Sequence, residues 1–311
     1  MPADGRIAVP EALAAAHSRY SGAADRAWSA ALPELAAAYL ERWELRRDGP
    51  VTHGMVALVL PVHCPDGTPA VLKLQPVDEE TTGEADALRV WDGDGAVRLL
   101  RHDPDTGTTL LERLDPSRTL SAVPDDLAAL RTLAELLARL TAHPAPSGMR
   151  RLADVAAGLL DRLPGALPAL ADPAERRLLA DCAAATRELI HESGDRLLHW
   201  DLHYENVLAP LPGSGREPWL AIDPKPLEGD PGFELFPALW NRWDDVVATG
   251  DVPRMVRRRF DLMTETLGLD RERARGWTLA RVLQNAVWDV EHGAAALQPV
   301  QVAIVEALTD R

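Results

Sequence analysis

The sequence predicts an α+β fold in two parts, a strand-rich part over residues 1–115 and a helical part over residues 116–311. Short apolar runs rich in Val and Leu follow residue 50 and are separated by turns that contain Gly and Pro. Beyond Asp115-Pro116 the apolar residues recur at the spacing of amphipathic helices. The polar residues suited to catalysis lie within the helical part, directly after two short apolar runs.

Residues 1–47 are expected to add helices to the N-terminus of the strand-rich part, because residues 10–47 are rich in Ala with Leu and Trp anchors. Pro33 is expected to begin a new helix, since proline is tolerated in a first turn. No pattern here indicates chemistry. We therefore expect a structural addition that packs on the strands.

Two hairpins and one helix are predicted for the rest of the strand-rich part. The first hairpin joins Met55–Val62 to Ala70–Leu74, and the second joins Val97–Arg101 to Thr108–Leu114. Between them, Glu84–Trp91 carries an apolar stripe at helical spacing and is predicted to be a helix.

Two short strands and six helices are predicted for the helical part. The strands, Arg196–Leu198 and Trp219–Ile222, are expected to bring the polar residues that follow them to one end of a sheet. The segment from Pro164 to Pro173 is expected to separate the second helix from the third. The predicted helices are 125–140, 151–163, 174–192, 253–267, 271–292 and 298–309.

Composition narrows the class of protein. A formal charge of −15 argues against non-specific nucleic-acid binding and is compatible with a cationic ligand, although an acidic surface also keeps a protein in solution. Cys64 and Cys182 form no CxxC pattern, so neither a disulfide framework nor a structural zinc site is indicated. With no signal peptide and no apolar run of about 18 residues, we expect a cytoplasmic protein that binds no membrane.

Lysine usage singles out two positions. Of the 33 basic residues only Lys73 and Lys225 are lysines. The lysine ammonium is a point charge and the arginine guanidinium is a planar fork, so the two are not interchangeable at a phosphate site. Lys73 lies within a predicted strand, where the alternative to a functional role is an ordinary lysine on the solvent face.

The residues with the clearest chemistry lie between His199 and Leu208 and in the Ile222-Asp223 that follows. Asp201 offers a carboxylate that can orient a hydroxyl and accept its proton. Asn206 and Asp223 offer an amide oxygen and a carboxylate, which are hard ligands suited to Mg²⁺. This combination indicates phosphoryl transfer from a nucleotide.

The constellation resembles the catalytic and metal-binding loops of the aminoglycoside phosphotransferase family, the small-molecule branch of the protein-kinase-like fold. Within that family, Ile222–Lys225 and Gly229–Leu235 resemble the group of bacterial streptomycin 6-kinases and hydroxyurea kinases. The resemblance extends over residues 50–292. Trp200 departs from it, since the family more usually has a small residue before the catalytic aspartate. The implied fold has two lobes, a small strand-rich N-terminal lobe and a larger helical C-terminal lobe.

The resemblance implies an enzyme that transfers the γ-phosphate of ATP, or of another nucleoside triphosphate, to a small-molecule hydroxyl with the help of Mg²⁺. Asp201 would be the catalytic base, and Asn206 and Asp223 would hold the metal ion. An aminoglycoside of the streptomycin type is the leading acceptor. The alternatives are an amino sugar, another metabolite or hydroxyurea as acceptor, or a catalytically silent module that only binds nucleotide.

For the nucleotide, the resemblance implies that Lys73 binds the phosphates and that a glutamate of the next helix holds its ammonium. Glu84 is preferred because it shares a helix face with Leu88 and Trp91. The rival partners are Glu79, Glu80 and Asp86.

Two further nucleotide contacts are expected from the order of the elements. The backbone of Glu112 and Leu114, at the end of the second hairpin, would connect the lobes and meet the adenine. No GxGxxG motif is present to cover the phosphates. The backbone amides near Gly54 are the remaining candidates for that role.

His199 and His203 allow a second interpretation, in which they bind zinc together with Asp201 as in a hydrolase. No third histidine lies nearby, so both are expected instead to hold the loop by hydrogen bonds. Lys225 is expected either near the phosphates or on the surface. Glu234 is expected to cap the helix that follows it.

The acceptor is expected to be cationic, rich in hydroxyls and bound by the helical part. Carboxylates next to indole rings suit guanidino and ammonium groups through charge-assisted hydrogen bonds and cation–π contacts. The alternative is that these tryptophans belong to the core and the acids to the solvated surface. The candidates are Asp244, Trp288, Asp289 and Glu291.

Overall fold

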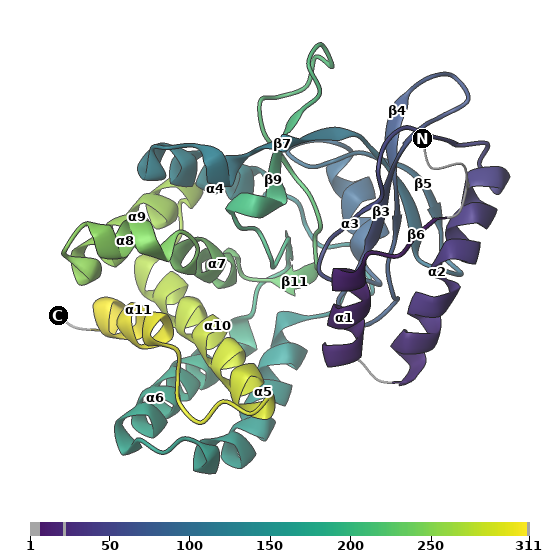
Figure 1. The fold of residues 1–311 in the computed structure, drawn as a ribbon. Helices are drawn as coiled ribbons and strands as arrows, with labels where there is room; N and C mark the ends of the chain where they lie inside the picture. Colours follow the sequence, from purple (N-terminus) through teal and green to yellow (C-terminus); the bar gives the residue numbers. More distant parts are fainter. Residues whose placement is uncertain (1–6, 21–22, 310–311) are drawn as a thin grey trace. The chain divides into compact units, whose positions relative to one another are not determined.

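The computed structural model describes residues 7–20 and 23–309, and these divide into two compact units. The first unit takes the chain up to Gly93 together with Val97–Leu114 and Pro210–Gly215. The second unit takes the rest of the described chain. After Leu114 the chain enters the second unit and stays in it up to Ala209. In Figure 1 the first unit is mainly purple and blue, and the second is teal, green and yellow.

Among the described residues, the first unit is built around a six-stranded sheet with the order β1-β3-β4-β6-β5, in which β2 also pairs with β3. Neighbouring strands in this sheet are antiparallel, and both hairpins that the sequence predicts are present. The strands are β1 (Arg46–Arg47), β2 (Thr52–His53), β3 (Leu58–His63), β4 (Pro69–Leu74), β5 (Leu99–Asp103) and β6 (Thr108–Glu112).

The two N-terminal helices, α1 (Glu11–Tyr20) and α2 (Ala23–Arg42), cover one face of this sheet. Strand β3 alternates buried and half-buried side chains, as a strand with one covered face does. Leu58 and Leu60 of β3 share a core with Leu32 of α2. Figure 1 shows both helices in purple beside the strands. The N-terminal segment therefore packs on the strands, as expected.

Pro33 does not begin a helix, which corrects the expectation from the sequence, because it lies inside α2. Proline lacks an N–H to donate and crowds the preceding turn, which costs a helix about 3 kcal/mol. Leu32 and Ala36 on either side of Pro33 are completely buried. Burial of this helix face therefore keeps the helix continuous where the local sequence favours an interruption.

The short strands of the second unit form two small sheets in the described part of the chain. Strand β9 (Val207–Pro210) lies between β10 (Leu220–Ala221) and β7 (Leu114–Thr119), and β8 (Arg196–Leu198) pairs with β11 (Leu227–Gly229). The two strands that precede the candidate site residues, β8 and β10, thus belong to different sheets. This corrects the expectation of one sheet, since such short strands carry too little pattern to specify a partner.

Helices make up most of the second unit, and the predicted ones are present with modest differences at their ends. Pro164 lies inside α5 instead of between helices, another correction. The helix expected after Glu234 is present as α7, whereas the short helix α8 is not expected from the sequence. No helix in the described part of the chain is long and apolar enough to cross a membrane. The helices of this unit are α4 (Asp126–Leu140), α5 (Leu152–Ala166), α6 (Pro173–Leu189), α7 (Leu235–Trp240), α8 (Trp243–Ala248), α9 (Val252–Leu267), α10 (Arg271–Glu291) and α11 (Pro299–Thr309).

Helix α10 occupies the centre of the second unit and packs on α5, α6 and α11 (Figure 1). Asp270 caps its N-terminus by accepting the N–H of Arg273 at 2.8 Å. Trp277 and Ala280 of this helix share a core with Trp200 and Leu198. The residue that precedes the candidate base Asp201 is therefore anchored in the helical core.

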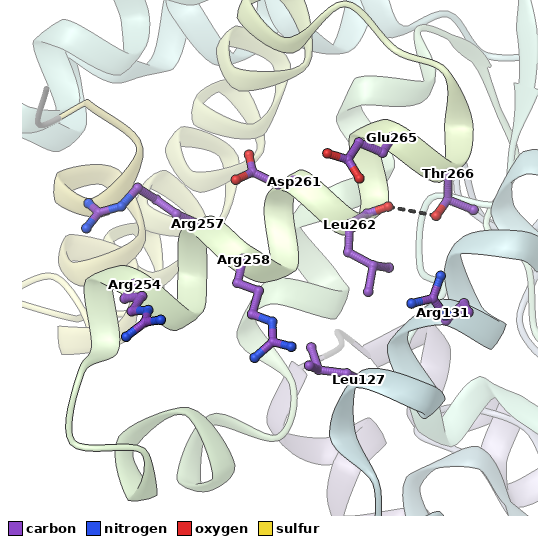
Figure 2. Close-up of a pocket in the computed structure, with 9 residues that line it drawn as sticks. All are labelled: Leu127, Arg131, Arg254, Arg257, Arg258, Asp261, Leu262, Glu265 and Thr266. Carbon is purple, nitrogen blue, oxygen red and sulfur yellow. Dashed lines mark hydrogen bonds between the residues drawn. The ribbon is translucent and has the colours of Figure 1, made fainter.

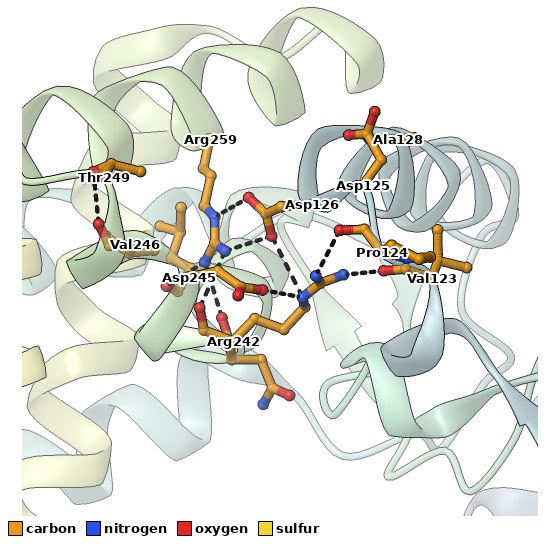
Figure 3. Close-up of polar contacts among 12 residues, drawn as sticks. Val123, Pro124, Asp125, Asp126, Ala128, Arg242, Asp245, Val246, Thr249 and Arg259 are labelled. Atoms are coloured by element: carbon orange, nitrogen blue, oxygen red, sulfur yellow. Dashed lines mark hydrogen bonds and ion pairs between the residues drawn. The ribbon is translucent and has the colours of Figure 1, made fainter.

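A buried ion pair joins α9 to the start of α4 (Figure 3). Arg259 is completely buried, and its guanidinium donates to both carboxylate oxygens of Asp126, at 2.5 and 3.1 Å. It also donates to the carbonyl oxygen of Asn241 at 2.9 Å. The neighbouring Arg242, with a left-handed φ of 54°, donates to the carbonyl oxygen of Val123 at 2.8 Å. These contacts hold the segment between α7 and α8 against both α4 and α9.

Candidate active site

The loop after β8 is held by a histidine that is completely buried. The Nε2 atom of His199 lies 2.9 Å from the carbonyl oxygen of Ile222, and a carbonyl only accepts, so Nε2 carries the proton. Burial lowers the pKa of His199 to about 4, which keeps the ring neutral. Its Nδ1 atom then accepts the N–H of Asp201 at 3.4 Å. His199 therefore links the segment of Asp201 to the segment of Asp223.

Asn206 is tied to both of the other candidate residues through the main chain. Its Nδ2 atom donates to the carbonyl oxygen of Asp201 at 2.9 Å, and its own carbonyl accepts the N–H of Ile222 at 2.9 Å. The second bond continues the β9–β10 ladder, in which Val207 lies opposite Ala221. Asp201, Asn206 and the Ile222-Asp223 pair thus lie on segments that are bonded directly to one another.

The backbone is strained at two places in this site. Trp200 and Asp223 have φ angles of 65° and 58°, in the left-handed region that costs a residue other than glycine about 1 kcal/mol or more. Such conformations persist only where the surrounding structure imposes them, and they gather at functional sites. The strain supports a functional role for the turns that present Asp201 and Asp223.

Lys225 lies beside Asp201. The side-chain ammonium of Lys225 is 3.3 Å from the Asp201 carboxylate. The main-chain N–H of Lys225 donates to the carbonyl oxygen of His199 at 3.0 Å. The Lys225 side chain is 38% exposed and that of Asp201 is 26% exposed, so both reach solvent. Of the two expectations for Lys225, the structure favours a place within the candidate site.

Glu234 is a site residue that the sequence analysis misses. It makes no side-chain capping bond to α7, which corrects the expectation of a cap. Instead, its Oε1 atom accepts the N–H of Trp200 at 2.8 Å, and burial raises its pKa to about 7 against the opposing effect of Arg281. The sequence feature that could have indicated a buried role for Glu234 is its position as the single acid among the apolar residues of Phe233–Phe236.

Trp200 itself is packed between two arginines. The guanidinium carbons of Arg150 and Arg281 lie 4.0 and 5.0 Å from the centres of its rings, within range of cation–π contact. The side chain is only 3% exposed and belongs to the core cluster with Leu198 and Trp277. This packing explains how a large residue is accommodated at a position whose backbone favours glycine.

In the first unit, the structure brings Lys73 and Glu84 together. Strand alternation places Lys73 on the sheet face opposite Leu72 and Leu74, which belong to the core with α2. Helix α3 (Glu84–Trp91) begins at Glu84, whose Oε1 atom lies 2.8 Å from Nζ of Lys73. Both side chains are buried. Gln75, another residue that the sequence analysis misses, donates to the second Glu84 oxygen.

The other two nucleotide candidates lie where β6 ends and β7 begins. The N–H of Glu112 donates to the carbonyl oxygen of Arg98 at 3.0 Å, and its carboxylate accepts the N–H of Arg98 at 2.8 Å. Leu114 begins β7. In the β2–β3 hairpin, the N–H of Gly54 donates to the carbonyl oxygen of Ala57 at 2.9 Å, so this amide is engaged within its own turn.

The acceptor candidates are divided between two helices. Asp244 is exposed on α8, whereas Trp288, Asp289 and Glu291 lie on α10. Asp289 accepts hydrogen bonds from Gln298 and Gln301, each at 2.9 Å, and Glu291 pairs with Arg162 at 3.1 Å. The indole of Trp288 is 49% exposed and stacks on His292. Two of the three carboxylates, Asp289 and Glu291, thus already have protein partners.

Comparison with known proteins identifies the family. A family model described as aminoglycoside/hydroxyurea antibiotic resistance kinase matches residues 42–293. The chain is 59% identical to a streptomycin 6-kinase of Streptomyces glaucescens over 97% of both chains. It is 56% identical to a hydroxyurea phosphotransferase of Kitasatospora aureofaciens, over 98% of this chain and 87% of that protein. The chain belongs to the aminoglycoside/hydroxyurea antibiotic resistance kinase family.

Solved structures agree with the fold of this kinase family. A thermostable mutant of an aminoglycoside phosphotransferase, in complex with ADP and hygromycin B, has a TM-score of 0.57 at 17% identity and covers 88% of this chain and 99% of its own. A choline/ethanolamine kinase family protein from Mesorhizobium loti has a TM-score of 0.56 at 16% identity, with coverages of 89% and 95%. The predicted protein-kinase-like α+β fold, family and phosphotransferase class are therefore confirmed.

In this kinase, Asn206 and Asp223 form a donor set that suits a divalent cation. Because Nδ2 of Asn206 donates to the main chain, Oδ1 is the atom of that amide left to face a ligand. An amide oxygen and a carboxylate are the hard ligands that Mg²⁺ prefers, with water and phosphate oxygens completing its shell. The zinc interpretation requires a cluster of three or more His, Cys, Asp or Glu residues, and the described part of the chain contains no such cluster able to hold a metal ion.

Proposed function

We propose that this kinase transfers the γ-phosphate of ATP, with Mg²⁺, to a hydroxyl of a streptomycin-type aminoglycoside. The observation that carries the proposal is the hydrogen-bonded arrangement of Asp201, Asn206 and the Ile222-Asp223 segment. The acceptor follows from the relatives, since two proteins that are 59% and 56% identical to this chain are named streptomycin 6-kinase.

The reaction needs a proton acceptor close to the attacking hydroxyl. Asp201 is partly exposed and its main chain is held by His199 and Asn206. Its carboxylate accepts a hydrogen bond from the acceptor hydroxyl and takes that proton as the acceptor oxygen bonds to the γ-phosphorus. The bond from the γ-phosphorus to the bridging oxygen breaks, and ADP leaves with that oxygen. A metal ion held by Asn206 and Asp223 supplies charge neutralisation for the phosphates.

Two lysines are proposed to bind phosphate oxygens. Lys73 is buried and its ammonium is oriented by Glu84, as a phosphate-binding lysine requires. Lys225 lies 3.3 Å from Asp201, close enough to contact the transferred phosphoryl group at the reacting end. Since lysine occurs in this chain only at these two positions, a shared role at one substrate accounts for both.

The contacts of the acceptor candidates distinguish the side chains that already have protein partners from those that could bind a ligand. Asp244 is exposed and makes no hydrogen bond or ion pair through its side chain in the described part of the chain. Asp289 and Glu291 already bind Gln298, Gln301 and Arg162. We propose Asp244 as the carboxylate most available to a cationic acceptor.

The test is an ATP turnover assay with Mg²⁺ in which streptomycin, hydroxyurea and a neutral sugar are compared by kcat/KM. We expect streptomycin to be phosphorylated, with the phosphate located on the product by ³¹P and proton NMR. A product that carries phosphate on the 3″ hydroxyl would instead match the relative from Klebsiella pneumoniae, named streptomycin 3″-kinase, which is 32% identical. Turnover of none of these acceptors, by protein that binds ATP, would contradict the proposal.

Hydroxyurea is the second candidate acceptor, and one observation favours it. The relative named hydroxyurea phosphotransferase is 56% identical to this chain, as similar as one of the streptomycin 6-kinases. Hydroxyurea is small and neutral, so its binding needs no exposed carboxylate. A kcat/KM for hydroxyurea about tenfold above that for streptomycin would make it the acceptor.

A further inference from the structure

A hollow between α4 and α9 in the second unit is lined by four arginines (Figure 2). Its volume is about 520 Å³. In a chain of net charge −15, a hollow lined by four arginines and two acids is locally positive, opposite to the charge of the whole chain. The lining residues are Leu127, Arg131, Arg254, Arg257, Arg258, Asp261, Leu262, Glu265 and Thr266. We refer to this hollow as the α4–α9 pocket.

The spacing of the arginines puts like charges on one helix face. Arg254, Arg257 and Arg258 are at positions i, i+3 and i+4 of α9, and side chains at these positions are neighbours on a helix surface. Arg131 reaches the pocket from α4. Like charges at this spacing destabilise an isolated helix, so an anion that bridges them removes a repulsion.

The protein itself does little to neutralise these charges. The guanidinium groups of Arg131, Arg254 and Arg258 make no hydrogen bond or ion pair in the described part of the chain, and that of Arg257 donates to the carbonyl oxygen of Ala307 at 3.2 Å. Asp261 has the helical spacing to neutralise Arg257 or Arg258, but Arg271 binds it instead.

Two guanidinium nitrogens of Arg271 donate to Oδ1 of Asp261, at 2.6 and 3.0 Å, and both side chains are partly exposed. Glu265 is the only other acid that lines the pocket, against four arginines. The pocket therefore keeps a positive balance.

Arg259, the next residue of α9, has a different environment from Arg257 and Arg258. Arg259 follows Arg257 and Arg258 directly, yet it is completely buried and bound to Asp126. Arg259 thus forms a structural ion pair, whereas Arg257 and Arg258 line the pocket. Figure 2 shows Arg258 and Arg131 with their guanidinium groups on either side of Leu127.

We propose that the α4–α9 pocket binds a small anion that carries at least two phosphate groups. The planar guanidinium fork matches two oxygens of a phosphate, and four forks along two helices suit an extended anion better than a single phosphate. Leu127 and Leu262 offer an apolar surface for the rest of the molecule. None of the lining residues belongs to the proposed catalytic, metal or nucleotide sites.

The experiment measures binding of inorganic pyrophosphate to the whole protein by isothermal titration calorimetry. A saturating concentration of AMP-PNP with Mg²⁺ is present, so that the nucleotide site is occupied. We expect one bound pyrophosphate, and we expect the double variant Arg254→Gln/Arg258→Gln to bind it at least about tenfold more weakly. The matched control is Arg177→Gln on α6, an exposed arginine away from the pocket, which should bind like the wild type.

Each other outcome decides against the proposal. Wild-type protein that binds no pyrophosphate, or a double variant with wild-type affinity, would rule out the site. Citrate that binds as tightly as pyrophosphate would replace the phosphate class by anions in general. Kinase turnover is measured on every variant and is expected to stay within about twofold of the wild type, because the pocket arginines take no part in the transfer. The proposed function and the pocket can therefore fail independently.

Discussion

Asp201 contacts three neighbouring residues, two through its main chain and one through its carboxylate. The neutral ring of His199 accepts its N–H, Asn206 donates to its carbonyl oxygen, and Lys225 pairs with its carboxylate. At the scale of the residue, the proposed chemistry therefore depends on a carboxylate whose main chain is fixed while its side chain reaches solvent.

Replacing Asp201 by Asn removes the proton acceptor and leaves the main-chain bonds in place. We expect kcat to fall by about 10²- to 10⁴-fold, the usual contribution of a general base, while the dissociation constant for AMP-PNP stays near that of the wild type. Steady-state kinetics and calorimetry measure the two quantities. Glu205→Gln, an exposed acid in the same loop, is the control and should keep its turnover. Near-normal turnover of the Asp201 variant would remove this residue from the mechanism.

The two proposed metal ligands should respond to the Mg²⁺ concentration. For Asp223→Ala and for Asn206→Ala we expect the Mg²⁺ concentration at half-maximal turnover to rise about tenfold or more, because each change removes an oxygen ligand. High Mg²⁺ should restore part of the activity. The same titration on Glu205→Gln, an exposed acid that is not a proposed ligand, should match the wild type. Unchanged Mg²⁺ dependence in both variants would assign the metal to other residues.

The buried carboxyl of Glu234 makes stability depend on pH. Burial raises its pKa from 4.5 to about 7, so between these values the folded protein holds a proton that the unfolded chain releases. The free energy of unfolding therefore includes a contribution of about 3 kcal/mol that is fully present below about pH 4.5. This contribution is lost as the pH rises through 7. Glu234→Gln keeps an oxygen acceptor for the N–H of Trp200 without the charge.

The measurement is urea unfolding of the wild type and the Glu234→Gln variant between pH 4.5 and 8. We expect the variant to gain stability relative to the wild type as the pH rises, with the difference concentrated between pH 5 and 7.5. Glu205→Gln should run parallel to the wild type over the same range. Parallel curves for Glu234→Gln as well would show that its carboxyl has an ordinary pKa.

At the scale of the element, the arrangement of α4, α8 and α9 depends on one buried arginine. Arg259 satisfies both oxygens of Asp126 and the carbonyl oxygen of Asn241, while Arg242 donates to Val123 in the same cluster (Figure 3). The guanidinium of Arg242 also lies 5.6 Å from the ring centre of Tyr204, which stands in the loop between Asp201 and Asn206. The cluster therefore contacts the proposed catalytic loop through Arg242 and Tyr204.

Breaking this pair should cost far more than removing a surface arginine. We expect Arg259→Ala to lower the free energy of unfolding by about 3–5 kcal/mol, because it leaves the carboxylate of Asp126 without its main partner. The neighbouring Arg258→Ala should change it by no more than about 0.5 kcal/mol, since that side chain is exposed. Urea unfolding at one pH compares the two. A similar small effect for both would mean that α9 is held by its apolar face alone.

At the scale of the whole molecule, the net charge of −15 should favour a cationic acceptor over a neutral one. We expect the KM for streptomycin to rise several-fold between about 20 and 300 mM salt, because the screening length falls as the ionic strength rises. The KM for hydroxyurea, measured in the same buffers, should stay constant. A streptomycin KM independent of salt would show that neutral contacts dominate its binding.

Much of the secondary structure could be predicted because its causes are local. Glu84–Trp91 and Arg196–Leu198 have the same ends in the structure as in the prediction. Apolar spacing and turn residues act within a few positions, so the chain alone displays them. The predictions of helix ends at Pro33 and Pro164 are wrong because the cause there is not local. The effect of a proline on a helix is local, but it is outweighed by burial of a helix face against residues distant in the sequence.

The sequence by itself determined the chemical types at the site and the family. Asp201 and Asn206 are five positions apart, and Asp223 follows one hairpin later, so their spacing is a property of the chain. Only the tertiary structure decided which distant groups hold them. Glu234 lies 34 positions from Trp200, and Arg259 lies 133 positions from Asp126. Burial and pairing across such separations set the pKa of a carboxyl and the strain of a turn, because both depend on neighbours that only the fold supplies.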